Sequence, residues 1–186
     1  MKKILIKTKD TQSYRNWRLG NQYFHGRDEH VVSLFPDPDS HLFTENECLI
    51  TSLAIMLRHF GIEKEDNETF FNPWILYRKL MGCKAFDSQG TLSLRALERL
   101  YPLDYAGTML YSPEKLKTVW ETGQPFLIVA SGIHSPKHFL VPDYNIQDNM
   151  AVIDCLWNRQ YLSEYERVIE LQVYWKSDEG MMYCIE

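Results

Sequence analysis

Apolar residues recur at helical spacing directly after a short polar stretch, between residues 45 and 61. Five of them fall on one face of a helix: Leu49, Leu53, Met56, Leu57 and Phe60. Gly61 follows, and glycine is common just past the C-terminal end of a helix. The pattern predicts an amphipathic helix that carries Cys48 in its first turn, where the polar stretch ends.

Three more segments carry the start and stop signals of helices, at residues 72–82, 91–101 and 112–123. Prolines near the start, glycines at the end and small polar residues at the cap position are typical of helix boundaries. These signals come from Pro73 and Gly82, from Thr91 or Ser93, and from Ser112 with Pro113. Together with the first helix, they predict a mainly helical region over residues 44–123.

The period of the pattern changes after this region. Residues 124–131 form a continuous apolar run, which is typical of a buried strand. Residues 138–145 and 149–157 predict two more strands joined by a polar turn, and residues 168–175 and 181–186 predict a final strand pair. We therefore expect an antiparallel sheet in the C-terminal part of the chain.

The order of these elements predicts the fold class. Helices followed by an antiparallel sheet over residues 124–186 indicate an α+β fold, and the length suits one domain over residues 1–186. Residues 1–43 predict a short strand and then an aromatic-rich arm, with one further strand near residues 30–35.

Composition and charge narrow the classes of partner. The chain has 186 residues, 45% of them hydrophobic and 24% charged, with a formal net charge of −5. A negative net charge does not indicate the basic surface with which proteins bind nucleic acid or an anionic membrane. We read no signal peptide and no transmembrane segment in the sequence. We therefore expect a cytoplasmic protein without nucleic-acid or membrane partners, and release by another protein stays open as an alternative.

The four cysteines are scattered and include no CxxC pair, so neither a structural zinc site nor a disulfide framework is expected. His134 and His138 could form a metal pair with Asp143 or Cys155. Pro136 lies between the two histidines, however, and the spacing of metal ligands is missing. We therefore expect no metal and no organic cofactor. His59, near the end of the first helix, is interpreted as a residue that complements the helix dipole.

Three residues could form a catalytic triad. Cys48 would be the nucleophile, since a helix N-terminus and a neighbouring imidazolium both favour the thiolate. His138 opens one predicted strand and Asp154 ends the next, so a hairpin would bring the carboxylate beside the imidazole and orient it. Asn46 is a candidate oxyanion donor, although it could instead cap the helix.

The segment around Cys48 resembles the nucleophile helix of the bacteriocin-processing (double-glycine leader) peptidases, a branch of the papain-like cysteine peptidases. Further similarity lies in the strand after Gly123, in the strand that His138 opens and in the segment around Asp154, so it covers about residues 44–186. In the nucleophile helix, the residues that carry the resemblance are Thr51, Ser52, Leu53, Ala54, Leu57, Phe60 and Gly61.

This resemblance implies a papain-like fold in which the nucleophile helix packs on the C-terminal sheet. It implies a thiol protease that cleaves peptide or isopeptide bonds in a peptide, a protein or a cell-wall peptide. Three positions depart from the family pattern: Leu49 replaces a glycine, Cys155 replaces a proline, and Leu42 replaces an upstream glutamine that supplies the oxyanion hole.

Two other functions remain open at this stage. The missing glutamine, with two carboxylates beside Cys48, fits a papain-like protein that binds a partner without turnover. Acyl transfer is the third hypothesis, in which an amine rather than water accepts the thioester, as in transglutaminases.

Overall fold

The computed structural model describes residues 40–62, 73–131, 136–143, 150–154 and 161–176. Several expectations lie outside these residues: the early strands, the aromatic-rich arm up to residue 39, the turn between the two predicted strands and the last strand at residues 181–186. His134, Cys155 and Cys184 also lie outside them.

The described elements form an antiparallel sheet with helices on both faces. In chain order they are α3 (Ser40–His59), α4 (Pro73–Gly82), the 3-10 helix η1 (Leu94–Arg99), β1 (Leu103–Leu110), α5 (Pro113–Thr122), β2 (Phe126–Ala130), β3 (His138–Pro142), β4 (Val152–Ile153), the 3-10 helix η2 (Leu162–Glu164) and β5 (Val168–Lys176). The strand order is β1-β5-β2-β3-β4, and every neighbouring pair is antiparallel. The α+β class and the antiparallel sheet are therefore confirmed.

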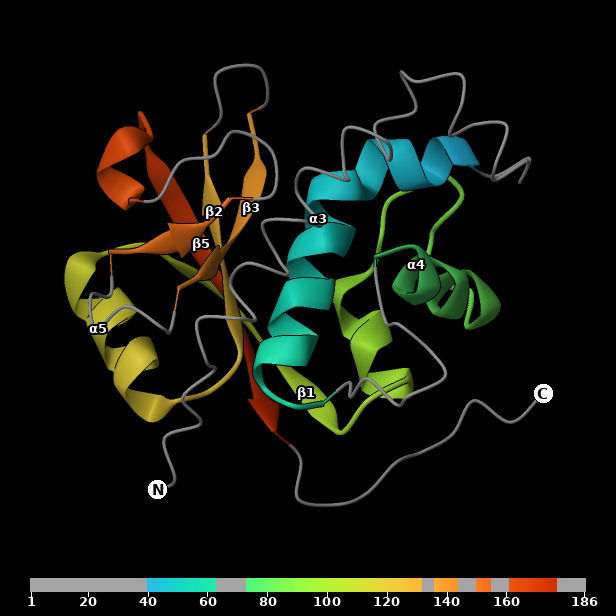
Figure 1. The fold of residues 1–186 in the computed structure, drawn as a ribbon, viewed down its shortest axis with the longest axis horizontal. Helices are drawn as coiled ribbons and strands as arrows, with labels where there is room; N and C mark the ends of the chain where they lie inside the picture. Colours follow the sequence, from blue (N-terminus) through green and yellow to red (C-terminus); the bar gives the residue numbers. More distant parts are fainter. Residues whose placement is uncertain (1–39, 63–72, 132–135, 144–149, 155–160, 177–186) are drawn as a thin grey trace.

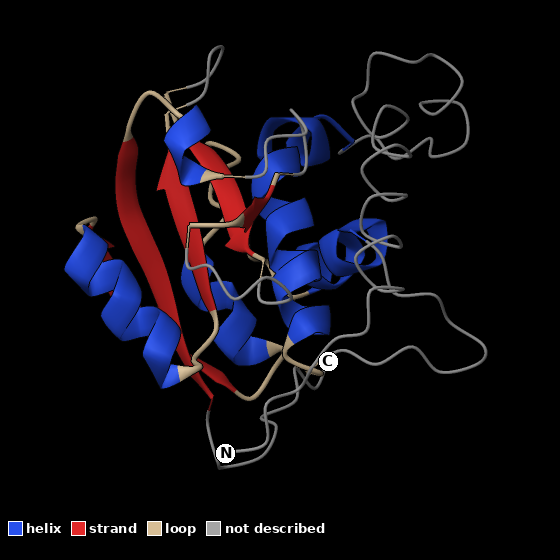
Figure 2. Cartoon of the chain, turned by 60° about the vertical axis from the view of Figure 1, so that its left-hand side comes forward, coloured by secondary structure: helices blue, strands red, loops and turns tan. Residues whose placement is uncertain are grey.

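The sheet separates two layers of helices. In Figure 1, α5 covers one face of the sheet, while α3 and α4 lie on the other, and Figure 2 shows the strands between helices from a second direction. Alternate residues of the same strand enter different cores. Leu127 packs with α3 and α4, whereas Phe126 and Ile128 pack with α5. Burial on both faces explains why β2 is a continuous apolar run.

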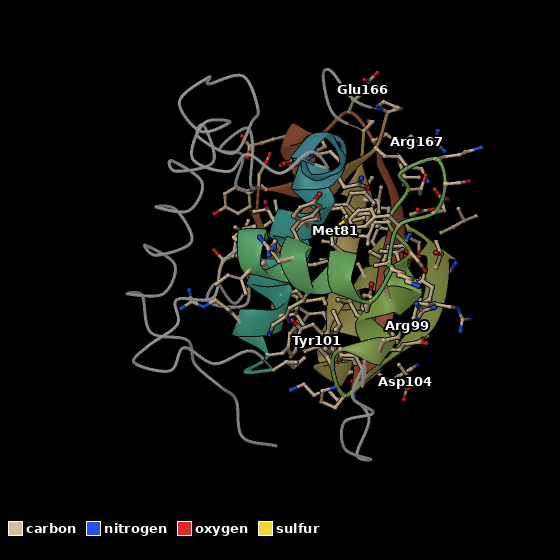
Figure 3. The ribbon with its side chains drawn as sticks, turned by 90° about the vertical axis from the view of Figure 1, so that its right-hand side faces the viewer. Met81, Arg99, Tyr101, Asp104, Glu166 and Arg167 are labelled. Carbon is tan, nitrogen blue, oxygen red and sulfur yellow. The ribbon has the colours of Figure 1, made fainter. Side chains whose placement is uncertain are left out.

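Helix α4 begins at Pro73 and ends at Gly82, as predicted. The C-terminal end of α4 contacts the end of η1 and the residues that follow it. Arg99 donates a hydrogen bond to the carbonyl of Cys83 at 3.0 Å, and the Lys79 ammonium lies 5.5 Å from the centre of the Tyr101 ring. Figure 3 shows this side of the molecule, with Met81 on α4 and with Arg99 and Tyr101 below it.

Helix α5 and the end of α3 also follow the predicted signals. Ser112 caps α5 by accepting a hydrogen bond from the Lys115 backbone N–H. Gly123 after α5 and Gly61 after α3 both have a positive φ, of 66° and 65°. Glycine adopts this left-handed conformation without the steric cost of a Cβ atom, so both helices end at these residues.

The structure differs from the predicted elements in two places. The segment at residues 91–101 contains a 3-10 helix of six residues rather than an α-helix, and Ser93 occupies its cap position without a side-chain hydrogen bond. Strand β1 lies inside the region predicted to be mainly helical. The register of β1 shifts between Tyr105 and Gly107. Burial alternates along the strand, but Ala106 and Leu110 are apolar residues at exposed positions, so the sequence does not show this alternation.

The predicted partner of β5, at residues 181–186, lies outside the described residues. Both edges of β5 are occupied, by β1 on one side and by β2 on the other. Leu171, for example, is opposite both Met109 and Ile128. Adjacency in sequence suggested a hairpin, but β5 is the second strand of the sheet and pairs with strands that precede it by many residues.

None of the helices in the described part of the chain combines the length and the apolar character that crossing a membrane requires.

Candidate active site

The pairing of β3 with β4 brings His138 and Asp154 together. Val141 is opposite Ile153 and Pro142 is opposite Val152. If this register continues by one residue, the side chains of Asp154 and His138 lie on the same face of the sheet. They are close enough for the carboxylate to reach the imidazole ring. The His138 Nε2 atom lies 2.9 Å from the Asp154 Oδ1 atom, and both side chains are buried. The predicted contact between these two residues is confirmed.

Tyr165 is a further member of this cluster. Its hydroxyl donates a hydrogen bond to Oδ2 of Asp154, the carboxylate oxygen that His138 does not use. Its ring stacks on the His138 ring, with centroids 6.4 Å apart and an angle of 23° between the planes. The sequence contained no signal for this residue, because Tyr165 stands alone between Glu164 and Glu166 in a segment without periodic pattern.

Cys48 reaches His138 from the other side, on helix α3, and its side chain is half-buried. The Ser52 hydroxyl, one helical turn later, donates a hydrogen bond to the Phe139 carbonyl at 2.9 Å. Since Asp154 occupies Nε2, the buried Nδ1 atom is the ring nitrogen left for the thiol. The structure thus brings together all three residues of the predicted triad.

The pKa of His138 reflects these neighbours. Burial lowers this pKa, because an imidazolium loses hydration in the protein interior. Hydrogen bonds of the imidazole with the Asp154 carboxylate, which accepts, and with Cys48, together with the negative charge that each can carry, outweigh burial and raise the pKa of His138 to about 9. The protonated imidazole is therefore favoured at neutral pH, and an imidazolium beside a thiol favours the thiolate.

The position of Cys48 within its helix differs from the prediction. Helix α3 begins at Ser40, so Cys48 lies inside the helix rather than in its first turn. Figure 1 shows that α3 changes direction between its first, blue part and its longer, cyan part. Polar residues before Cys48 suggested a loop, but they continue the helix. The positive end of the helix dipole acts within the first turn, so it does not activate this thiol, and His138 is the group that can.

The Asn46 side chain has a structural partner. Its Nδ2 atom donates a hydrogen bond to the Gly90 carbonyl at 2.9 Å, which ties α3 to the turn before Leu92. The Asp87 carboxylate orders the same turn by accepting hydrogen bonds from the backbone N–H groups of Gln89 and Thr91. One Asn46 amide hydrogen is thus committed to this contact, and its role as oxyanion donor stays a prediction.

The interpretation of His59 needs a correction. Its side chain is buried at the last residue of α3, and burial, with a smaller contribution from the Lys176 charge, lowers its pKa to about 4. His59 is therefore neutral at neutral pH and does not complement the helix dipole with a charge. Its proximity to Lys176, from the far end of β5, could not be read from sequence spacing.

Two residues of the alternative metal site, His134 and Cys155, lie outside the described residues. His138 is engaged with Asp154 and Cys48. Within the described ranges, no group of three or more His, Cys, Asp or Glu side chains is arranged to hold a metal ion.

Comparison of the chain with protein-family models, with curated proteins and with solved structures gave no match. The geometry of the site is therefore the basis for assigning a function.

Proposed function

We propose that this protein is a cysteine hydrolase of papain-like type, with Cys48 as nucleophile, His138 as general base and acid, and Asp154 as the residue that orients His138. The observation that carries the proposal is the contact chain from Cys48 through the His138 ring to the buried Asp154 carboxylate. A helix supplies the thiol, and neighbouring antiparallel strands supply the imidazole and the carboxylate.

The reaction would proceed in two stages. In the resting pair Nδ1 of His138 holds the proton, and the Cys48 thiolate attacks the carbonyl carbon of a peptide or isopeptide bond to form a tetrahedral oxyanion. Collapse of this intermediate breaks the carbon–nitrogen bond, and His138 gives its proton to the leaving amine. Water, deprotonated by His138, then hydrolyses the thioester and regenerates the thiol.

The raised pKa of His138 supports this mechanism. A histidine with a pKa of about 9 holds its proton at neutral pH, so the resting pair would be thiolate and imidazolium. Because Asp154 occupies Nε2, the proton on Nδ1 is directed to the reacting sulfur and leaving group rather than elsewhere. The substrate class we propose is a peptide, a protein or a cell-wall peptide, and the compartment is the cytoplasm.

A binding protein without turnover is the second candidate. It is favoured by the contact of Asn46 with Gly90 and by Leu42, which stands where the resembling peptidases have an oxyanion glutamine. Such a protein could keep a reactive thiol but would stabilise the oxyanion poorly. Acyl transfer uses the same thioester and differs only in the acceptor.

The first test is the pH dependence of alkylation of Cys48 by iodoacetamide, followed by mass spectrometry in the wild type and in His138→Ala. Cys83 is an internal control, because its buried thiol bonds to the Leu80 carbonyl, far from this histidine. We expect Cys48 to react well below the ~8.5 of an ordinary thiol and to lose this reactivity in His138→Ala. If the profile of Cys48 matches that of an ordinary thiol and ignores His138, the hydrolase proposal fails.

Turnover is tested next with peptide and murein-fragment libraries. Product release that depends on Cys48 supports hydrolysis, whereas a reactive thiol without cleavage of any member of the libraries supports the binding protein. An added primary amine that captures the acyl group in place of water would indicate acyl transfer.

A further inference from the structure

We propose that Tyr165 is a positioning residue for the Cys48–His138 pair, acting by keeping the buried Asp154 carboxylate ionised and oriented. The inference rests on the proposed function, since it concerns the reactivity of Cys48. It adds a residue for which the sequence offered no signal and which does not touch the reacting sulfur.

The first argument is the burial of Asp154. Its side chain is 0% exposed, and an ionised carboxylate in such surroundings is unfavourable unless hydrogen bonds replace its lost hydration. The structure places one donor on each carboxylate oxygen, His138 on Oδ1 and Tyr165 on Oδ2. Hydrogen bonds to the charged form of a group favour that form. Removing the Tyr165 hydroxyl would therefore weaken the charge that faces His138.

Second, backbone hydrogen bonds hold the turn that carries Tyr165. Its backbone N–H bonds to the Leu162 carbonyl at the end of η2, and the Leu162 N–H bonds to the Met150 carbonyl. Ala151 forms a bridge with Tyr161 at the start of the same turn. The turn that carries Tyr165 is thus attached to the segment that leads into β4 and Asp154. Hydroxyl and carboxylate belong to one connected unit, which suits a positioning contact.

The third argument is the stacking of the two rings. The planes of Tyr165 and His138 are 23° from parallel, and the Tyr165 ring packs in the core on the α5 side of the sheet. This contact limits rotation of the imidazole about its bond to the chain. Hydroxyl and ring therefore act on the same pair, one on the carboxylate and the other on the imidazole.

The ionisable groups around His138 come from several elements. Asp154 follows β4, Cys48 is on α3, and Tyr165 follows η2. The neighbouring Lys137 points its ammonium to Glu170 on β5, at 3.6 Å, which partly balances both of these charges. Among these groups, Tyr165 donates to the carboxylate oxygen that His138 does not use.

The experiment compares Tyr165→Phe with the matched control Tyr161→Phe. Each loses one hydroxyl from the same turn, and Tyr161 is 40% exposed. We expect Tyr165→Phe to move the pH profile of Cys48 alkylation about one pH unit towards alkaline pH, so that alkylation on the rising limb of the profile slows about tenfold, because one unit is a factor of ten. Tyr161→Phe should match the wild type. A Tyr165→Phe protein that melts earlier but keeps the wild-type pH profile would overturn the inference, because Tyr165 would then contribute only packing.

A measurement on the unaltered protein covers the case in which Tyr165→Phe does not fold. The Tyr165 hydroxyl proton, identified by NMR through its proximity to His138, should shift with the same apparent pKa as the His138 ring. A hydroxyl signal that stays constant through the titration of His138 would overturn the inference. If the reactivity of Cys48 does not depend on His138, the proposed function is overturned instead. The two failures are therefore distinguishable.

Discussion

Ser52 on α3 donates a hydrogen bond from its hydroxyl to the Phe139 carbonyl on β3, at 2.9 Å. Ser52 lies one helical turn after Cys48, and Phe139 directly follows His138. Residues four apart lie on the same side of a helix. One partly buried hydrogen bond therefore joins the helix that carries the thiol to the strand that carries the imidazole.

Replacement of Ser52 by alanine tests this relationship. We expect Ser52→Ala to lower the free energy of unfolding by about 1–2 kcal/mol, since the buried carbonyl loses a donor. The reactivity of Cys48 should fall at the same time, because α3 can then shift against β3. Urea unfolding and alkylation rates measure the two effects. Ser93→Ala is the matched control, since Ser93 is exposed and its side chain makes no cap hydrogen bond. Equal stability of the two variants would contradict the prediction.

The stability of the protein should fall in mildly alkaline solution. The pKa of His138 is about 9 in the folded protein and 6.5 in the unfolded chain, so the folded state binds the proton more tightly. The stabilisation is complete below pH 6.5 and is lost as the pH rises through 9. Urea midpoints measured across this window should decline in the wild type and decline less in His138→Gln. Parallel curves for the two proteins would show that His138 does not retain its proton on folding.

His59 should produce the opposite dependence in acid. Burial, assisted by the Lys176 charge, lowers its pKa from 6.5 to about 4, so the unfolded chain binds the proton more tightly. The resulting stability is present above pH 6.5 and is lost as the pH falls through 4. In His59→Phe, which cannot take up a proton, the acid limb of the stability curve between these values should flatten. An unchanged acid limb would indicate that other groups cause the loss.

Two exposed glycines at helix ends should respond oppositely to alanine. Gly61 has a φ of +65°, whereas the φ of Gly82 is not positive, and an added Cβ atom would meet nothing within 4 Å at either position. Gly61→Ala should therefore destabilise the protein by about 1 kcal/mol through backbone strain alone. Gly82→Ala should stabilise it by about 0.5 kcal/mol, because alanine restricts the unfolded chain without strain. Thermal unfolding measures both, and a shift of the same sign in the two variants would refute this explanation.

Local patterns in the sequence predicted most of the elements around the site. The helix after Cys48, α4, α5 and strands β2, β3 and β5 all follow from apolar periodicity and from Pro, Ser and Gly signals. The contact of His138 with Asp154 could also be predicted, because a short hairpin converts positions in the sequence directly into positions on neighbouring strands.

Strand β1 could not be predicted in the same way. Apolar residues stand at exposed positions of this strand, among them Leu110, and its partner β5 lies far along the chain, so local residues did not identify it. The same reason applies to the described neighbours of β5, since β1 and β2 precede it by many residues. The start of α3 was missed because the polar residues before Cys48 fit a helix as well as a loop, and packing decides between the two.

The sequence by itself determined the residue types of the candidate site, the order Cys, His, Asp, and the pairing of His138 with Asp154 across a hairpin. These depend on short-range periodicity, which the chain carries locally. Only the tertiary structure decided that Tyr165 donates to Asp154, that Ser52 holds α3 against β3, and that His59 lies near Lys176. Each of these contacts joins segments that are brought together by the burial of two cores on the faces of one sheet, and such burial depends on the whole chain at once.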